Sequence, residues 1–593
     1  MRKIKNIISS AFVALALGCS SMMTSCTDYL TLYPTNAVIL ENYWKTAEDV
    51  NAMLASCYSS MANSDVIKRL MIWGELRADN MITRTGASND LKYIVEANLL
   101  ETNGYFNWSN FYKTINYCNM VLQYAPGVLE EDPDFTQGDL DVIKGEMYAL
   151  RALCQFILVR SFRDVPLSRV AMDADDQPRV YPQYSPYETL DYIMADLDSA
   201  EALCMKTGGW SDSRKNYARI TKNAVYAMKA DVNLWRAAFA QYSILSGDTA
   251  KYIDTDKVVQ FTETDVNNYY TQAIENCDSV LAAMRRQVLK EYEDARLPLT
   301  ELDTLNNPYL LIQNTSKDYL TSYDEIFLGE TLRGGDYITP NEVIFRLDFN
   351  DDNKNTAIKD FYGYSESTGS FVVPSSAPIA LNDKGLWKKS DLRYNAFTSS
   401  KYTAASSGSA SDKKVTTITK YNIMTAKPSD KGIQWYTQDN IVSDWIFYRK
   451  TDVMLMKATA LAYRYQEKDA AEAFALVNAV NKRSVLTAND QLKEKDYEDQ
   501  DALKALILDE RLRELTYEGK RWYDLVRLAL CKNTTSDVID LVKAKLESSG
   551  NAVATKMTSI YSLFCPIYES ELKVNPLLKQ NPVFERSSST EKN

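Results

Sequence analysis

The chain of 593 residues contains no histidine. Without imidazole a protein has no Ser-His or Cys-His nucleophile, no histidine-ligated zinc site and no histidine proton shuttle near neutral pH. This absence excludes most hydrolase mechanisms. It leaves open the enzymes that work with a pair of carboxylates.

Cysteine pairs with metal-binding or redox spacing are also missing, since no Cys-x-x-Cys occurs. Zinc knuckles and thiol redox pairs are therefore not indicated. Seven cysteines follow residue 26; they are odd in number, widely spaced and often inside helical patterns. They are predicted to be small buried hydrophobic side chains rather than a disulfide framework. They are Cys57, Cys118, Cys154, Cys204, Cys277, Cys531 and Cys565.

Long apolar runs are confined to the N-terminus, and no later stretch is long enough to predict a membrane-spanning helix. Three cations, Arg2, Lys3 and Lys5, precede an apolar run over residues 7–23, which is the pattern of a secretory signal. We expect residues 1–25 to be cleaved and Cys26 to be acylated, because a small residue precedes it and a polar Thr27-Asp28 tether follows. Cys19 is the alternative acylation site. An acyl chain would hold the protein on a membrane without a spanning helix.

Basic residues are fewer than acidic ones. The 67 Lys and Arg against 79 Asp and Glu give a net charge of −12. Removal of the three signal cations leaves 64 against 79, a net charge of −15. A nucleic-acid partner is therefore not expected.

Hydrophobic residues make up 45% of the chain and charged residues 25%, so the chain must bury a large core. By length it could form two to four domains or one continuous helical body. Apolar residues recur at helical spacing in segments that can be paired as hairpins. A mostly α fold follows, with helical hairpins like those of tetratricopeptide repeats but without a fixed repeat length. The predicted helices cover residues 46–61, 108–124, 138–162, 186–204, 219–242, 266–287, 446–465, 469–484, 501–517 and 535–547.

Between about residues 288 and 440 the helical periodicity disappears and Gly, Asn, Ser, Asp and Pro become frequent. We predict a large loop-rich insertion with short strands, for example at residues 342–347, between helical regions at about 40–287 and 440–550. The Ser- and Thr-rich tract at 399–419 is predicted to be an exposed hairpin tip or loop. Such a long irregular segment is improbable in a compact body unless it carries function.

Six motifs occur in an order that resembles the SusD/RagB family of Bacteroidota outer-membrane lipoproteins. They include Phe162-x-Asp164-Val165-Pro166-Leu167 and Arg511-x-Arg513-Glu514-Leu515-x-Tyr517-Glu518-Gly519, and all six lie at residues 26–34, 145–167, 219–224, 448–458, 511–525 and 566–582. The resemblance implies a single SusD-like domain over residues 26–593. It also implies a lipid-anchored protein on the outer face of the outer membrane. There it would bind nutrient, usually glycan, and deliver it to a SusC-like TonB-dependent transporter.

The segment around Arg511, Glu514 and Glu518 could be taken for a catalytic cluster. On a helix, however, Arg511 and Glu514 are three residues apart and Glu514 and Glu518 are four apart. Salt bridging between Arg511 and Glu514, together with helix-end contacts, therefore explains them, and a structural role is predicted.

The run Asp348-x-Asn350-x-Asp352 has the acidic spacing of a calcium loop but lacks the glycine and the final glutamate of an EF-hand. We expect a solvated turn after a strand. A loosely bound calcium ion is the alternative, and no other cofactor is expected.

Sugar recognition needs an aromatic face for the apolar side of a pyranose and planar polar groups for its hydroxyls. Two stretches, residues 79–107 and 362–387, supply both kinds of group outside the predicted helices, whereas Trp108 opens a helical pattern and is expected in the core. The predicted ligand-binding residues are Asp79, Arg84, Tyr93, Asn103, Tyr105, Tyr362, Tyr364 and Trp387.

Non-catalytic capture of a glycan is the preferred hypothesis. Capture of peptides or another non-sugar nutrient on the same fold is an alternative. A glycosidase that uses two carboxylates is a third reading, although no compact acidic motif points to one.

Overall fold

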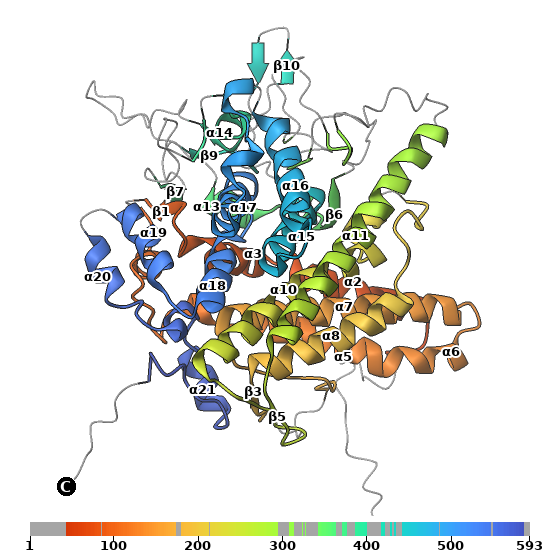
Figure 1. Cartoon of the computed structure of the whole chain (residues 1–593). Coiled ribbons are helices and arrows are strands. Elements are labelled where there is room, and N and C mark those ends of the chain that lie inside the picture. The colour runs from red at the N-terminus through yellow and green to blue at the C-terminus, as the bar shows by residue number, and fades with distance from the viewer. Residues whose placement is uncertain are drawn as a thin grey trace, which may run out of the picture. The chain divides into compact units, whose positions relative to one another are not determined.

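The computed structural model is dominated by helices that pack against their neighbours in the chain (Figure 1). It describes residues 43–84, 86–173, 180–212, 214–294, 307–312, 323, 326–327, 342–350, 352–362, 371–375, 386–388, 390–399, 417–421, 427–429, 432–434, 442–485, 487–546 and 549–585. The predicted signal and both candidate acylation sites, Cys19 and Cys26, lie outside these residues. None of the described helices is both long and apolar enough to cross a membrane.

The first half of the body is a continuous array of helices that begins at α2 (Ala47–Met61). Each helix packs against the next member of the series: α2 on α5, α5 on α7, α7 on α8, α8 on α10 and α10 on α11. In Figure 1 these helices run from red-orange to yellow-green. This arrangement is the predicted hairpin array. The later helices span α5 (Ser109–Tyr124), α7 (Gln137–Phe162), α8 (Pro186–Leu203), α10 (Lys222–Ser246) and α11 (Glu263–Asp294).

Local sequence fixes where these helices begin. Thr46 and Asp49 form a capping box at the start of α2, and Thr136 and Asp139 form another at the start of α7. In each box the side chains satisfy backbone N–H groups that would otherwise lack a partner. Ser185 caps α8, and Pro186 follows at the first helical position, where its missing N–H costs nothing.

The second half of the array starts at α15, which packs against α11, α16 and α17. It therefore continues the first half directly, across the loop-rich insertion. α10 and α18 are also in contact, which closes the C-terminal helices onto the N-terminal ones. These elements span α15 (Lys450–Arg464), α16 (Asp469–Ser484), α17 (Gln500–Leu515), α18 (Arg521–Lys532), α19 (Ser536–Leu546), α20 (Gly550–Ala554) and α21 (Glu569–Val574).

The described parts of the insertion contain the predicted short strands. β6 (Val343–Leu347) pairs antiparallel with β12 (Trp445–Arg449), so the start and the end of the insertion lie side by side. The predicted helix at 446–465 was wrong over its first residues, because 445–449 is this buried strand. The tract at 400–416 lies outside the described residues, but its flanks pair as β8 (Thr398–Ser399) and β9 (Thr417–Ile418).

The cysteines behave as predicted. Of the seven that the structure describes, all are free; six are buried and Cys531 is partly buried. Trp108 is likewise in the core, with 2% of its surface exposed.

The described residues from Thr46 onward form one compact unit, separate from a short N-terminal unit of which residues 43–45 are described. In that N-terminal unit the rings of Tyr43 and Trp44 meet edge to face. The domain boundaries at residues 25 and 26 remain predictions.

Candidate functional site

The two ring-bearing stretches of the sequence meet in space. β1 (Met81–Thr83), in the first stretch, pairs antiparallel with β7 (Val372–Pro374), in the second. The Arg84 N–H extends the pairing by donating to the carbonyl of Phe371 at 2.9 Å. Residues almost 300 positions apart thus form one surface.

Around this pairing lies a set of partly buried polar and aromatic side chains, which we call the β1–β7 surface. Helix α3 (Ser64–Met71) contributes Lys68, whose Nζ lies 3.0 Å from Asp360 Oδ2 on α13 (Thr356–Phe361). The Phe371 N–H donates to the Asp360 carbonyl at 3.2 Å, which connects this ion pair to β7. Tyr93 belongs to this surface because its helix, α4 (Asn89–Val95), packs against β1, and Tyr105 because it interacts electrostatically with Lys68. The members of the surface are Lys68, Arg84, Tyr93, Tyr105, Asp360 and Phe371, all partly buried.

Tyr105 stands on a backbone that is held from several sides. Asn103 Oδ1 accepts from the Tyr105 N–H at 3.0 Å, and Asn103 Nδ2 donates to the Asp90 carbonyl at 3.1 Å. The indole N–H of Trp73 donates to the Tyr105 carbonyl at 2.9 Å. Asn103 itself is only 2% exposed, so in this structure it positions Tyr105 rather than facing solvent as predicted.

The buried Arg69 side chain also holds the loop that carries Tyr105. Its guanidinium donates to three backbone carbonyls, those of Asn107 at 2.5 Å, Asp65 at 2.9 Å and Gly104 at 3.1 Å. Burial lowers the pKa of Arg69, yet the three acceptors satisfy the group. The loop that carries Tyr105 is therefore rigid, as a preorganised binding surface requires.

The polar groups of the surface are suited to bind hydroxyls. Burial raises the pKa of the Tyr105 phenol, so it stays a neutral donor and acceptor at physiological pH. Arg84 Nη1 is buried and has no hydrogen-bond partner in the part of the chain that the structure describes. An unpaired buried donor is costly, and a ligand oxygen would satisfy it.

Three other predicted ligand residues are buried in internal contacts. Asp79 accepts from Arg521 Nε and Nη2, both at 2.8 Å. The Tyr362 hydroxyl donates to the Tyr517 carbonyl at 3.2 Å, and Trp387 packs edge-on against Tyr394 with none of its surface exposed.

At most 2% of each of these three side chains is exposed, so they are held in internal contacts and none lies on the β1–β7 surface. That they contact a ligand stays a prediction; Asp79 borders a separate cavity described below. Tyr364 lies outside the described residues. Arg84, Tyr93 and Tyr105 remain the predicted residues that the structure places on one surface.

Lys68 and Asp360 were missed by the sequence reasoning. Each lies on a helix and has the pattern of a solvated charge. α3 and α13 also pack directly against each other, with the hydroxyls of Thr356 and Ser64 2.9 Å apart. Neither this contact nor the pairing of β1 with β7 has a local sequence signal.

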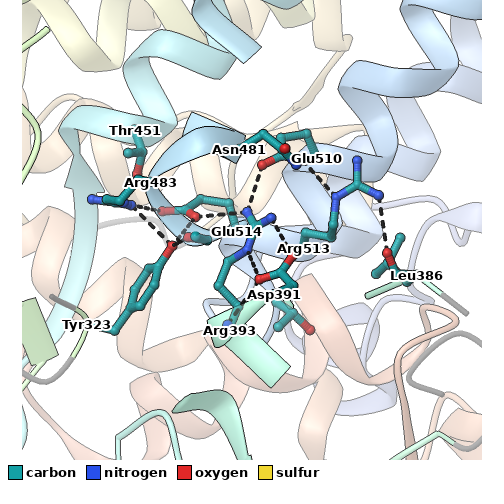
Figure 2. Close-up of polar contacts among 12 residues, drawn as sticks. Tyr323, Leu386, Asp391, Arg393, Thr451, Asn481, Arg483, Glu510, Arg513 and Glu514 are labelled. Atoms are coloured by element: carbon teal, nitrogen blue, oxygen red, sulfur yellow. Dashed lines mark hydrogen bonds and ion pairs between the residues drawn. The ribbon is translucent and has the colours of Figure 1, made fainter. Parts of the chain in front are cut away.

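Glu514 lies at the centre of a buried ionic cluster that supports this region from inside (Figure 2). Its carboxylate accepts from Arg449 Nη1 at 2.7 Å, Arg483 Nη2 at 2.5 Å and Arg393 Nη1 at 3.2 Å. All four side chains are fully buried. Burial alone would raise the pKa of Glu514, but the three guanidinium groups outweigh it and hold this pKa well below its usual value.

The cluster connects the insertion to the helical body. Arg393 comes from α14 (Leu392–Phe397) in the insertion, Arg449 from β12, Arg483 from α16 and Glu514 from α17. The structural interpretation of the Arg511–Glu514 segment is thus confirmed, whereas the predicted pairing along the helix is wrong. Arg511 Nε instead lies 2.8 Å from Asp524 Oδ2 on α18, because buried charges take partners with better geometry on neighbouring elements.

The Asp348–Asp352 run is a turn after β6, as predicted. Asn350 Oδ1 accepts from the N–H groups of Asp352 at 3.0 Å and Asn353 at 2.8 Å, and Asp348 accepts from Arg346 Nε at 2.8 Å. Within the described residues, no group of three or more Cys, Asp or Glu side chains is placed to hold a metal ion. Calcium binding remains a prediction.

Comparison with known proteins covers most of the chain. The sequence profile of the "SusD family" matches residues 348–584, and a second profile, described as "Starch-binding associating with outer membrane", matches residues 28–234. SusD-like protein P38 of Formosa agariphila is 24% identical over 554 residues, which cover 89% of this chain and 92% of that protein. SusD-like protein P25 of the same organism is 21% identical and covers 98% of each chain.

Solved structures share the fold. A SusD homologue from Bacteroides thetaiotaomicron superposes with a TM-score of 0.65 at 18% identity, covering 92% of this chain and 98% of its own. NanU from B. fragilis gives a TM-score of 0.61 at 18% identity, covering 94% and 100%. At these identities the likeness establishes the architecture alone.

Proposed function

Because the chain belongs to the SusD/RagB family and is a SusD-like nutrient-binding protein, we propose that it captures a glycan on the β1–β7 surface. Proteins of this family are generally binding proteins without catalytic activity. We propose that this one likewise holds its ligand without cleaving it and delivers it to a TonB-dependent transporter in the outer membrane.

One observation carries the proposal: the Tyr105 ring, on a loop held by hydrogen bonds, lies on the same surface as the Arg84 guanidinium, which has a nitrogen without a hydrogen-bond partner in the described chain. Tyr105 offers an apolar face and a neutral hydroxyl, and Arg84 offers donors that match ring or hydroxyl oxygens. The Lys68–Asp360 pair adds a further donor and acceptor at the border. This mixture fits a neutral polyol better than an apolar ligand or a strongly charged one.

The proposals that the protein is anchored to the outer membrane and delivers its ligand there rest on a family profile and not on the β1–β7 surface. The profile that matches residues 28–234 is described as associating with the outer membrane. We propose that the acylated Cys26 provides the anchor, and that the protein faces the cell exterior, where a polysaccharide would first be met.

Affinity electrophoresis tests the capture of glycan. The mature protein would be run in native gels cast with soluble starch, xylan or galactomannan. We expect retardation in at least one gel and its loss in Tyr105→Ala and Arg84→Ala, which each remove one contact worth about tenfold in Kd. Tyr292→Ala and Arg286→Ala on α11 are matched controls that should migrate like wild type.

Three results would overturn the proposal. Retardation that is unchanged in both β1–β7 variants would place the ligand elsewhere. New reducing ends in the recovered polysaccharide would show an enzyme, and binding of peptides with no retardation by any glycan would favour the peptide alternative.

A further inference from the structure

A cavity of about 590 Å³ lies beside α17 and is separate from the β1–β7 surface. Its lining comes from helices α16, α17, α18 and α19, from the connection between α16 and α17 (Val485, Asp490, Leu492 and Tyr497), from the insertion (Leu386, Lys388 and Asp391) and from Asp79, which lies just before β1. No residue of the β1–β7 surface lines it. Its size is within the range of small-molecule pockets.

Asn481 lines this cavity with an unsatisfied acceptor. The side chain is 3% exposed, and its Nδ2 donates to Glu510 Oε2 at 3.1 Å (Figure 2). Because a carboxylate only accepts, this contact fixes which end of the amide is nitrogen. Oδ1 is then left buried without a donor in the described chain. A ligand hydroxyl in the cavity would supply that donor.

Asp509 and Arg513, one turn apart on α17, bring an acceptor and a donor to the same cavity. Arg513 is held by Nε to Glu510 Oε2 at 2.7 Å and by Nη1 to the Leu386 carbonyl at 3.3 Å, which leaves Nη2 for another acceptor (Figure 2). The Asp509 side chain is exposed to solvent. Desolvation by the surrounding protein raises the pKa of its carboxyl, and this effect outweighs the lowering by Arg513.

Tyr497 supplies an aromatic wall. Its ring is partly buried and stacks on Phe474, with centroids 6.1 Å apart and an interplanar angle of 26°. Desolvation raises the pKa of Tyr497, so its hydroxyl stays protonated. The stacking on Phe474 holds the Tyr497 ring in one orientation at the cavity wall.

The lining carries three cations and four carboxylates, but part of this charge is neutralised by ion pairs. Asp79 is paired with Arg521, and Asp391 is paired with Arg393 behind the wall. The remaining Lys388 and Arg513 balance Asp490 and Asp509, so no strong net charge selects an anion or a cation. Donors and acceptors are mixed, and one wall is a ring. We propose that this cavity is a second binding site, which takes a neutral polyhydroxylated molecule about the size of one or two sugar rings. The proposal does not require that the β1–β7 surface binds a polysaccharide.

Saturation-transfer NMR on the full mature protein tests this site, with D-glucose, D-galactose and D-mannose as probes. At least one sugar should show transfer, and Asp509→Asn and Tyr497→Ala should each weaken its binding at least tenfold. Asp501→Asn, an exposed aspartate on the same helix, and Tyr292→Ala on α11 are the matched controls and should bind like wild type. Thermal unfolding checks that every variant is folded.

The variants of the two sites separate the two proposals. Tyr105→Ala and Arg84→Ala should leave the transfer to the bound sugar unchanged, whatever they do to retardation by polysaccharides. Absence of transfer for all three sugars, or transfer that survives both Asp509→Asn and Tyr497→Ala, would overturn the assignment. Binding of glycine or Ca²⁺ to this cavity in place of a sugar would overturn the ligand class.

Discussion

Glu514 is one carboxylate shared by three guanidinium groups in a site without solvent. Its substitution by a neutral isostere leaves three buried cations with too few acceptors, which is far more costly than the loss of a surface ion pair. The cluster therefore explains why a segment that looks catalytic serves the fold. It also gives the insertion a fixed base.

We expect Glu514→Gln to lower the free energy of unfolding by about 3 to 5 kcal/mol. Guanidinium chloride denaturation followed by circular dichroism measures it. The control is Asp501→Asn, an exposed carboxylate on the same helix, which should change stability by no more than about 0.5 kcal/mol. Equal stability of Glu514→Gln and wild type would show that the cluster does not support the fold.

Asp452 makes the stability of the fold depend on pH. Burial alone would raise its pKa, but Lys520 and Arg511 outweigh burial and lower it to about 2. The unfolded carboxyl takes up its proton at a higher pH than the folded one. Its stabilising contribution is therefore complete above about pH 4 and is lost as the pH falls toward 2.

Unfolding free energies measured between pH 5 and pH 2 by urea denaturation test this contribution. Wild type should lose stability across this range, by more than Asp452→Asn does, because the variant has no carboxyl to protonate. Parallel pH profiles of the two proteins would contradict the assigned pKa.

Residue type predicted only part of the candidate site. Arg84, Tyr93 and Tyr105 were predicted as ligand residues and lie on one surface, but Asn103 and Trp387 are buried. Residue type alone cannot separate these cases, because an asparagine that caps a turn and one that binds a sugar offer the same amide. Burial is decided by neighbours that are distant in sequence.

At the scale of elements, the segment η3 (Ile72–Leu76) is a π-helix that leads from α3 toward β1. Gly74 within it lies against Gly519, which has a φ of +72°. A Cβ on Gly74 would lie 1.9 Å from the Gly519 carbonyl oxygen. Both glycines are therefore needed where two backbones touch.

We expect Gly74→Ala to lower the free energy of unfolding by about 3 kcal/mol, at the upper end for overpacked sites. Gly138→Ala, on the exposed first turn of α7, is the matched control, because its added Cβ has only Thr136 Oγ1 nearby, at 3.6 Å. The control should be neutral or stabilised by about 0.5 kcal/mol. Similar melting temperatures for the two variants would contradict the close approach of the two glycines.

Helices with clear amphipathic spacing were predicted well: α16 spans Asp469–Ser484, as expected from the pattern. α18 (Arg521–Lys532) was not among the predicted helices, although it packs against α10. β12 was assigned to a helix because all five of its residues are apolar or buried, and a short continuous run of this kind has no diagnostic period. Pairing with β6, about 100 residues earlier, decides its conformation.

At the scale of the whole molecule, helices on both sides of the insertion form one array through the contact between α11 and α15. Loops carried on such a rigid array can present a ligand surface at low entropic cost. A tethered protein of this kind would expose that surface to polymers outside the cell.

Substitution of the predicted anchor tests the tether. Cys26→Ala should move the protein from the membrane pellet to the soluble fraction and abolish labelling by a fatty-acid analogue, because no other acylated thiol would hold it. Cys19→Ala is the matched control and should stay membrane-bound and labelled. Loss of labelling in Cys19→Ala alone would assign the anchor to the other cysteine.

Isothermal titration calorimetry of the mature protein with the polysaccharide that retards it tests the central claim most directly. The account predicts saturable binding by wild type, no measurable binding by the Arg84→Ala/Tyr105→Ala double variant, and a polysaccharide recovered at its original length. Equal Kd values for the two proteins, or a shortened polymer, would contradict it.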